Sequence, residues 1–296
     1  MTRCGHVALA GAPNVGKSTL LNALVGEHLA IVSPKAQATR LPVTGIRTEG
    51  DTQFVFHDLP GLLDPAYLMQ RRMVDQAVQS MDRVDVVVHL HPAADAPAPS
   101  LVALAGLDRP PRAPVLTVYT KGDLVSAERR RELEAEAPVL TVAGDAAGAA
   151  GLDRLLARVR EHLPEAPFQF DPDDLGTQPL RFFVVEYLRE AAFDLLGDEL
   201  PYAFAAEVEE FREDKRPMYI RVTLFVERES QKGIVVGRGG ATIKAIGAHA
   251  RARLEALTGT PVFLESWVKV LPKWRRSPAA LSRFGFPVSS SEKESA

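Results

Sequence analysis

The octapeptide Gly11–Ser18 is the feature that most constrains how this chain can fold. It reads Gly-Ala-Pro-Asn-Val-Gly-Lys-Ser and matches the phosphate-loop pattern G-x-x-x-x-G-K-[ST]. The apolar run Val7–Ala10 precedes it, and leucines at helical spacing follow it as far as Gly26, where a helix would end. A strand, a glycine loop and a helix in this order surround a phosphate with backbone amides and the positive end of the helix. The pattern therefore predicts a nucleotide-binding α/β domain.

The loop residues have separate expected roles in nucleotide binding. Lys17 would reach the β- and γ-phosphates, and the Ser18 hydroxyl would bind Mg²⁺. Thr19, which follows Ser18 in the helix, is included in the predicted site. The residues that we assign to the phosphates are Gly11, Ala12, Pro13, Asn14, Val15, Gly16, Lys17, Ser18 and Thr19.

A second motif, Asp58-Leu59-Pro60-Gly61, follows the loop by about 40 residues. Its carboxylate can hold Mg²⁺ through water, and the Gly61 amide can meet the γ-phosphate, which favours a GTPase over an ATPase. Thr39 is our candidate for a switch residue that binds Mg²⁺ only when a γ-phosphate is present. The predicted metal ligands are Ser18, Thr39 and Asp58, the predicted catalytic residues are Lys17, Thr39 and Gly61, and Leu59, Pro60 and Leu62 complete this part of the nucleotide site.

A third motif, Thr120-Lys121-Gly122-Asp123, predicts which base is bound. The Asp123 carboxylate can accept two hydrogen bonds from N1 and the exocyclic amine of guanine, which adenine cannot supply. Lys121 would lie along the base. The loop at Asp145 and Ala146 would back the base, with the Ala146 amide near the guanine oxygen.

Short apolar runs alternate with amphipathic stretches over residues 1–165, which predicts a mostly parallel sheet flanked by helices. The runs after the first are Phe54–Phe56, Val84–Leu90, Val115–Tyr119 and Val139–Val142. Residues 166–179 are dense in Pro, Asp and Gly and predict a linker. A smaller α+β domain is expected over 180–286, and the polar tail 287–296 is expected to be disordered.

Composition excludes some classes of protein. The chain has one cysteine, which rules out an internal disulfide framework and fits a reducing compartment. No apolar run approaches the ~20 residues that span a bilayer. From Lys215 onward there are 15 lysines and arginines against 6 aspartates and glutamates, whereas the first 214 residues hold 20 against 32. The C-terminal part therefore predicts contact with a polyanion.

The basic part contains a glycine loop, Gly237-Arg238-Gly239-Gly240, of the G-x-x-G type found in KH domains. Glycines let a nucleic-acid strand approach the backbone closely. The expected order around it is helix 180–196, strands 202–211 and 218–227, a short helix, the loop, a longer helix and strand 262–270, which is a type II KH domain. The predicted RNA-binding residues are Ile234, Val236, Gly237, Arg238, Gly239, Gly240, Ile243, Lys244 and Arg251.

Two tryptophans and three histidines receive separate predictions. We expect Trp267, inside an apolar strand, to be in the core. Trp274 could either stack on a base or pack under the C-terminal helix. The histidines His57, His89 and His91 lie at strand ends without the spacing of metal ligands, so they receive no chemical role.

Together these motifs resemble the Era family of ribosome-assembly GTPases, from GAPNVGKSTLLNALVG, SPKAQATR, DLPGL and TKGD to RESQKGIVVGRGGATIKAIGAHAR and LESWVKV. The resemblance implies a GTP-hydrolysing switch that binds GTP, GDP and Mg²⁺. It also implies binding to the 3′ end of 16S ribosomal RNA and a part in maturation of the 30S subunit. The sequence departs from the family pattern at Ala38, Thr120 and Asp145, which bears on nucleotide affinity and not on the identity of the base.

The resemblance carries further expectations. Leu62 stands where many GTPases have a glutamine that orients water, so we predict slow intrinsic turnover raised by RNA or ribosomal partners. Asn14 suggests the hypothesis of an activating K⁺. We expect a cytoplasmic monomer, and the family suggests peripheral contact with the inner membrane. Two alternatives are a non-catalytic RNA chaperone that keeps the nucleotide fold as a relic, and a ribosome GTPase of another branch.

Overall fold

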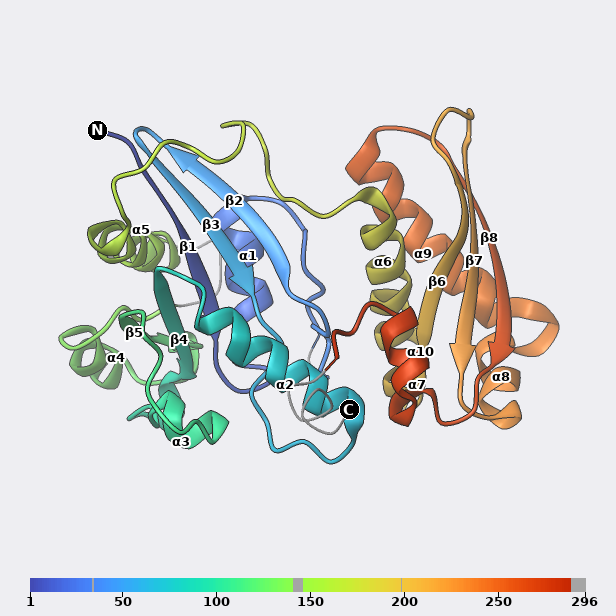
Figure 1. Ribbon diagram of the computed structural model, residues 1–296, viewed down its shortest axis with the longest axis horizontal. Coiled ribbons are helices and arrows are strands. Elements are labelled where there is room, and N and C mark those ends of the chain that lie inside the picture. Colours follow the sequence, from blue (N-terminus) through green and yellow to red (C-terminus); the bar gives the residue numbers. More distant parts are fainter. Residues whose placement is uncertain (34, 141–145, 198, 289–296) are drawn as a thin grey trace.

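The computed structural model describes residues 1–33, 35–140, 146–197 and 199–288, without the side chains of residues 146–148. These residues form two bodies, each built on its own sheet (Figure 1). The predicted fold class, a mostly parallel nucleotide-binding sheet with helices and then a smaller α+β domain, is confirmed. The exact domain bounds stay a prediction, and residues 289–296 of the predicted tail lie outside the description.

The first sheet has five strands in the order β2-β3-β1-β4-β5. All neighbours are parallel except β2 and β3, which are antiparallel. The strands are β1 (Arg3–Ala10), β2 (Val43–Glu49), β3 (Thr52–Asp58), β4 (Val86–Pro92) and β5 (Val115–Thr120). The predicted strand at 139–142 is not formed as such: Val139 makes only an isolated bridge with Tyr119, and Val142 lies outside the described residues.

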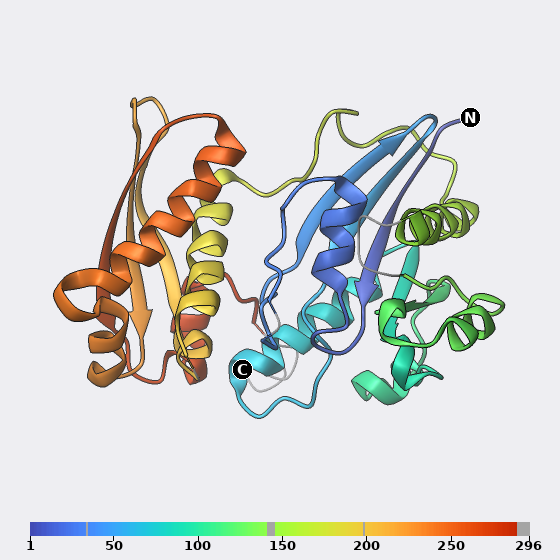
Figure 2. The same ribbon diagram turned by 180° about the vertical axis from the view of Figure 1, so that it is seen from behind.

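Helices cover both faces of this sheet, which is why its strands are continuous apolar runs. Val7 and Leu9 of β1 pack in one core cluster, whereas Ala8 and Ala10 pack in another. Figures 1 and 2 show the sheet from opposite sides, with α2 on one face and α1 on the other. The helices are α1 (Lys17–Val25), α2 (Leu68–Met81), α3 (Leu101–Ala105), α4 (Ala127–Glu134) and α5 (Ala146–His162), with 3-10 turns η1 (Ala93–Asp95) and η2 (Gly122–Leu124).

The second sheet has three strands in the order β6-β7-β8, with β6 antiparallel and β8 parallel to β7. Helices α6 and α9 pack on one of its faces through residues such as Val184, Leu188 and Leu254. The predicted helix-strand-strand-helix-helix-strand order is confirmed, with one short unpredicted helix, α7. The elements are α6 (Leu180–Leu195), α7 (Leu200–Ala203), β6 (Ala205–Arg212), β7 (Met218–Val226), α8 (Glu229–Val236), η3 (Arg238–Gly240), α9 (Ala241–Thr258), β8 (Val262–Val270), η4 (Trp274–Arg276) and α10 (Pro278–Arg283).

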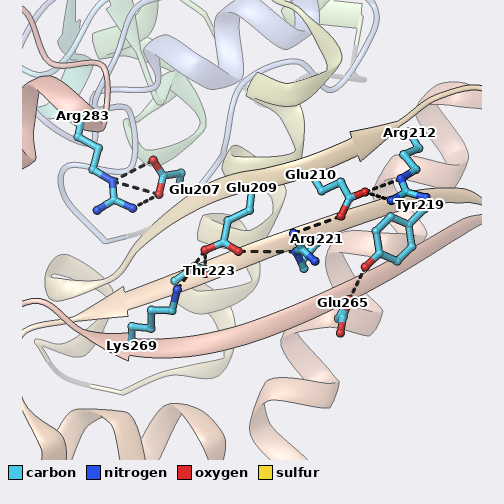
Figure 3. Close-up of polar contacts among 10 residues, drawn as sticks. All are labelled: Glu207, Glu209, Glu210, Arg212, Tyr219, Arg221, Thr223, Glu265, Lys269 and Arg283. Atoms are coloured by element: carbon cyan, nitrogen blue, oxygen red, sulfur yellow. Dashed lines mark hydrogen bonds and ion pairs between the residues drawn. The ribbon is translucent and has the colours of Figure 1, made fainter.

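The prediction for Trp267 is wrong. Its side chain is 56% exposed, and Phe263 on the same strand is 54% exposed. Helices cover only one face of this sheet, so alternate residues of β8 point to solvent. Figure 3 shows that charged residues of the outer face form ion pairs, such as Lys269 with Glu209 at 3.2 Å and Arg221 with Glu210 at 3.2 Å. Trp274, by contrast, is fully buried, so of the two alternatives the packed one is confirmed.

The segment between the two bodies lies along the edge strand β2. The Ile46 amide donates to the Leu175 carbonyl at 2.9 Å, and Gly45 forms an antiparallel bridge with Gly176. The Gln53 side chain also accepts from the amide of Phe170 at 3.1 Å. This contact pairs an edge that would otherwise be free, and it ties the linker to the strand that follows Thr39.

Candidate functional site

The phosphate loop joins β1 to α1 in a conformation that requires glycine. Gly11 has φ 147° and Gly16 has φ 97°. A Cβ at Gly11 would lie 2.4 Å from the Leu90 carbonyl oxygen, so a side chain cannot be accommodated. The loop curls around Lys17, whose ammonium donates to the carbonyls of Gly11 at 3.2 Å and Ala12 at 2.8 Å.

Lys17 is 6% exposed, and burial lowers its pKa to about 8 although Asp58 acts in the opposite direction. A bound polyphosphate would favour the charged form of this lysine. The buried ammonium at the end of the loop is thus suited to binding a negatively charged ligand.

Three oxygen-bearing side chains from three segments meet beside the loop. The Ser18 hydroxyl donates to Asp58 Oδ2 at 2.6 Å, the Thr39 hydroxyl donates to the same oxygen at 3.1 Å, and the two hydroxyls lie 2.9 Å apart. The other carboxylate oxygen, Oδ1, is buried and has no hydrogen-bond partner among the described residues. Burial raises the pKa of Asp58. A buried carboxylate with an unpaired oxygen and two hydroxyls fits a hard divalent cation.

The Asp58–Leu62 segment passes directly over the loop. A Cβ at Gly61 would lie 2.8 Å from the Pro13 nitrogen, so the two backbones are in contact at this point. The Leu62 amide donates to the Gly11 carbonyl at 3.0 Å, and the Leu62 side chain is buried in the core. Leu59 and Pro60 are buried as well, so only Gly61 of these residues lines the cavity described next.

A cavity of about 430 Å³ opens above the loop. Its lining residues come from the loop, the segment before β2, Gly61 and the guanine motif: Pro13, Asn14, Gly16, Lys17, Ser18, Thr19, Ile31, Val32, Ser33, Gln37, Ala38, Thr39, Gly61 and Lys121. Sequence reasoning missed Ile31, Val32, Ser33, Gln37 and Ala38. Their position between the first helix and Thr39 was the available signal, because a segment that closes on a ligand also lines its site.

The guanine motif lies at the end of β5. The Thr120 hydroxyl donates to the Val15 carbonyl at 2.7 Å and thereby ties this motif to the phosphate loop. Gly122 is anchored by a bond from its amide to the Leu140 carbonyl at 2.9 Å, and Asp123 is exposed in η2. Asp145 lies outside the described residues, and Ala146 is described only as the first residue of α5.

The glycine loop of the second body has the open backbone that the sequence predicts. Gly237, Gly239 and Gly240 have φ values of 72°, 60° and 81°. A Cβ at Gly237 would meet the Thr242 hydroxyl at 2.3 Å, whereas one at Gly239 would meet nothing within 4 Å. Arg238 and Gly239 are exposed.

Apolar and basic side chains lie together around this loop. Ile234 is 56% exposed, and Val236 and Ile243 are half-buried. Lys244 and Arg251 are exposed on α9 and are seven residues apart, which places them on one side of the helix. Exposed apolar groups are suited to contact with bases. The exposed cations beside them form no ion pair with the residues that the structure describes, so they are suited to phosphates.

The segment around Thr39, residues 35–40, also forms part of the contact between the two bodies. We call it the first switch segment. Arg40 is 3% exposed and donates to the carbonyls of Phe204 at 2.7 Å, Pro201 at 3.0 Å and Tyr202 at 3.1 Å. Lys35 donates to the carbonyls of Phe193 and Leu196 at 2.6 and 2.7 Å, and Arg189 of α6 donates to the Ala38 carbonyl at 2.6 Å.

Comparison with known proteins agrees with this geometry. Residues 6–121 match the family model of the 50S ribosome-binding GTPase, and residues 199–275 match that of the KH domain. GTPase Era of Geotalea daltonii is 40% identical over 95% of this chain and 97% of its own length. GTPase Era of Leuconostoc citreum is 37% identical over 96% of each chain.

Two solved structures of Era are similar over 97% of this chain and all of their own. An Era variant of Aquifex aeolicus bound to GDP and AlF₄⁻ has a TM-score of 0.87 at 33% identity. Era in complex with MgGDPNP and nucleotides 1506–1542 of 16S ribosomal RNA has a TM-score of 0.86 at 32% identity. The fold and the site therefore define a P-loop GTPase joined to a KH-type RNA-binding domain. The chain belongs to the Era family of GTPases, so it binds and hydrolyses GTP, and the family alternative of another branch is removed.

Proposed function

We propose that this chain is a molecular switch that binds the 3′ end of 16S ribosomal RNA and assists maturation of the 30S subunit. Support comes from its Era relatives and from the similar Era complex with that RNA. One observation carries the proposal. Adjacent residues of the first switch segment serve both domains, because Thr39 bonds to Asp58 in the nucleotide site and Arg40 bonds to carbonyls of the KH domain. A displacement of Thr39 would therefore be transmitted to the RNA-binding domain.

In the nucleotide domain, Lys17 would bind the β- and γ-phosphates, while the loop amides bind the phosphate oxygens. Ser18, Thr39 and Asp58 would hold Mg²⁺, which supplies charge neutralisation to the phosphates when bound. The Gly61 amide would donate a hydrogen bond to the γ-phosphate. When a γ-phosphate is present, Thr39 and Gly61 are both held, and release of phosphate frees the two segments together.

Base recognition would rest on the motif after β5. Asp123 would accept from guanine, Lys121 would lie along the base, and Asp145 and Ala146 would back it. Thr120 binds no base in this proposal. Its hydroxyl performs the bridging to the phosphate loop, so the departure from asparagine leaves this support in place.

RNA would bind at the glycine loop, with phosphates at Arg238, Lys244 and Arg251 and bases over the apolar side chains. The resemblance to Era further supports a cytoplasmic monomer with peripheral contact to the inner membrane. The described residues contain no helix long and apolar enough to cross a membrane.

K⁺ activation is a separate part of the proposal, based on Asn14. This residue has φ 61° and lines the nucleotide cavity from the phosphate loop. Its side-chain carbonyl could contribute to a K⁺ site that acts as an arginine finger does in other GTPases. We expect faster hydrolysis in potassium than in sodium at equal ionic strength, and equal rates would contradict the idea.

The experiment that tests the proposed function measures GTP hydrolysis with and without an RNA that covers the 3′ end of 16S ribosomal RNA. RNA should stimulate the wild type, Lys17→Ala should abolish turnover, and Gly239→Asp should lose only the stimulation. Gly259→Asp is the matched control, because Gly259 also has a positive φ of 62° and open space around its Cβ but ends α9 away from the loop. A rate of GTP hydrolysis by the wild type that is the same with and without RNA would contradict the proposal.

A further inference from the structure

Hydrolysis requires a group that holds the attacking water, and the usual group is missing. The water oxygen forms a bond to the γ-phosphorus, the bond to the β–γ bridging oxygen breaks with its electron pair leaving on GDP, and the water protons end on inorganic phosphate and solvent. In many GTPases a glutamine orients this water. Leu62 stands at that position here, and its side chain is 1% exposed in a cluster with Ala8 and Ala77. The Leu62 side chain has no hydrogen-bonding group and is buried in the core, so it cannot orient the attacking water.

The position of the water limits which residue can replace the glutamine. In-line attack places the water opposite the bridging oxygen, and the phosphate loop occupies the bridging side. The water therefore lies on the side of Thr39 and Gly61. The uncharged polar side chains that line the cavity are Asn14, Ser18, Thr19, Ser33, Gln37 and Thr39.

Most of these side chains lie on the bridging side or already form hydrogen bonds with other residues. Asn14 and Thr19 belong to the loop and its helix, on the bridging side, and Ser18 and Thr39 bond to Asp58. The Ser33 hydroxyl accepts from the Lys35 amide at 3.2 Å. Gln37 remains, and it carries both a hydrogen-bond donor and an acceptor.

Gln37 lies in the first of the two segments that close on the γ-phosphate and contacts the second. It precedes Thr39 by two residues and has φ 62°, a turn conformation that directs the chain around the cavity. Its side-chain oxygen accepts from the hydroxyl of Tyr67, 3.4 Å away. Tyr67 follows Gly61 by six residues and is the residue directly before α2. The segment before β2 thus supplies Gln37, and the segment after Gly61 supplies Tyr67, whose hydroxyl bonds to it.

Tyr67 is itself held by the KH domain. The Arg275 guanidinium lies 5.2 Å from the Tyr67 ring centroid, and Arg275 pairs with Glu227 at 2.6 Å. These contacts restrict where the Tyr67 hydroxyl can point. The Gln37 oxygen keeps a second lone pair, and the structure gives its amide nitrogen no bond to any of the residues it describes.

We propose that Gln37 is the catalytic residue that orients the attacking water in this GTPase, and that Tyr67 positions it. The Gln37 oxygen accepts a hydrogen bond from the water while its amide donates to a γ-phosphate oxygen. Gln37 does not remove the proton. Its contribution is orientation of the water and stabilisation of charge that develops on the phosphate.

The test measures steady-state and single-turnover GTP hydrolysis. It also measures the binding of two ligands, GDP alone and GDP with aluminium fluoride, by fluorescence of a labelled nucleotide. We expect Gln37→Ala to lower kcat by about 100-fold with KM changed less than twofold, because the lost contact is made to the transition state. Affinity for GDP should stay unchanged, whereas affinity for GDP with aluminium fluoride should fall by about the same factor as kcat. Tyr67→Phe should reduce kcat by about 3- to 10-fold, since Gln37 is then present but less well held.

Gln70→Met is the matched control. The Gln70 side chain accepts from the Ala66 amide at 2.8 Å, so it supports the same segment as Tyr67, but it does not line the cavity. We expect its kcat to equal that of the wild type. An unchanged kcat in Gln37→Ala, an equal loss in Gln70→Met, or a fall in GDP affinity that matches the fall in kcat would each overturn the proposal.

Discussion

Some ionisable side chains of the nucleotide domain are buried, so that protonating them destabilises the folded state, and His89 is the clearest case. This side chain in β4 is 2% exposed, and its Nε2 has no hydrogen-bond partner among the described residues. Burial, followed by the neighbouring His91, lowers the pKa of His89 to about 4. The folded protein therefore keeps this imidazole neutral at pH values where the unfolded chain protonates it.

The stability of the protein should consequently fall as the pH is lowered from about 6.5 to about 4. In that window the unfolded state binds more protons than the folded state, so acid favours unfolding. At ~1.4 kcal/mol per unit of pKa difference, His89 accounts for up to about 3 kcal/mol of this loss. Urea unfolding of His89→Gln should show a shallower pH dependence below pH 6.5 and a curve parallel to that of the wild type above pH 7.5. Parallel curves throughout the acid range would show that His89 does not titrate in this way.

Among elements, the first switch segment joins the nucleotide site to the KH domain, because Thr39 bonds to Asp58 and Arg40 bonds to KH-domain carbonyls. Its cations, Lys35 and Arg40, donate hydrogen bonds to carbonyls of the KH domain. The last carbonyls of a helix lack hydrogen-bond partners within that helix. Arg40 donates to three carbonyls at the end of α7, those of Pro201, Tyr202 and Phe204, of which the Pro201 carbonyl also accepts from the Phe204 amide. Such a contact is charge-assisted and buried, so it is specific in geometry as well as favourable in energy.

Arg40→Met should uncouple RNA binding from hydrolysis. It removes three hydrogen bonds and takes the guanidinium donors away from the carbonyls of Tyr202 and Phe204, which costs about 2–4 kcal/mol at the contact between the domains. We expect the stimulation of hydrolysis by RNA to be lost, while GDP affinity changes less than twofold. Arg47→Ala serves for comparison, because Arg47 donates to the Leu24 carbonyl at 2.9 Å inside the nucleotide domain. If Arg40→Met retains full stimulation, the first switch segment is not the connection.

At the scale of the whole molecule, the basic charge of the C-terminal part is distributed unevenly between two surfaces. The outer face of the second sheet carries exposed aromatic rings, but its cations are paired with carboxylates (Figure 3). The surface around the glycine loop instead has exposed cations beside exposed apolar groups. A polyanion is attracted by unpaired cations, so RNA should bind the loop surface and not the outer face.

This distinction is measurable through the salt dependence of RNA binding. Arg238→Ala should weaken binding to the 3′ end of 16S ribosomal RNA and reduce the slope of log K against log salt by about 1, the value for one lost phosphate contact. Trp267→Ala should leave both affinity and slope unchanged, although Trp267 is more than half exposed. A loss of affinity in Trp267→Ala with an intact loop would place RNA on the outer face.

The sequence by itself determined the features that depend on local chain geometry. A glycine where a Cβ would collide, as at Gly11, a lysine and serine at the start of a helix, and a G-x-x-G loop in basic surroundings each require a fixed local conformation. Apolar runs of the right length placed the parallel strands β1, β3, β4 and β5, but no run placed the edge strand β2, and the run at Val139 forms only an isolated bridge, because pairing with a neighbour decides whether a strand forms.

Only the tertiary structure decided which faces are covered and which distant residues meet. The periodicity of β8 is compatible with either face being buried, and the packing of α6 and α9 on one side left Trp267 in solvent. The contacts of Arg40 with α7 and of Gln37 with Tyr67 join residues far apart in the chain. Such contacts depend on how the elements pack together, and no local pattern of residues encodes them.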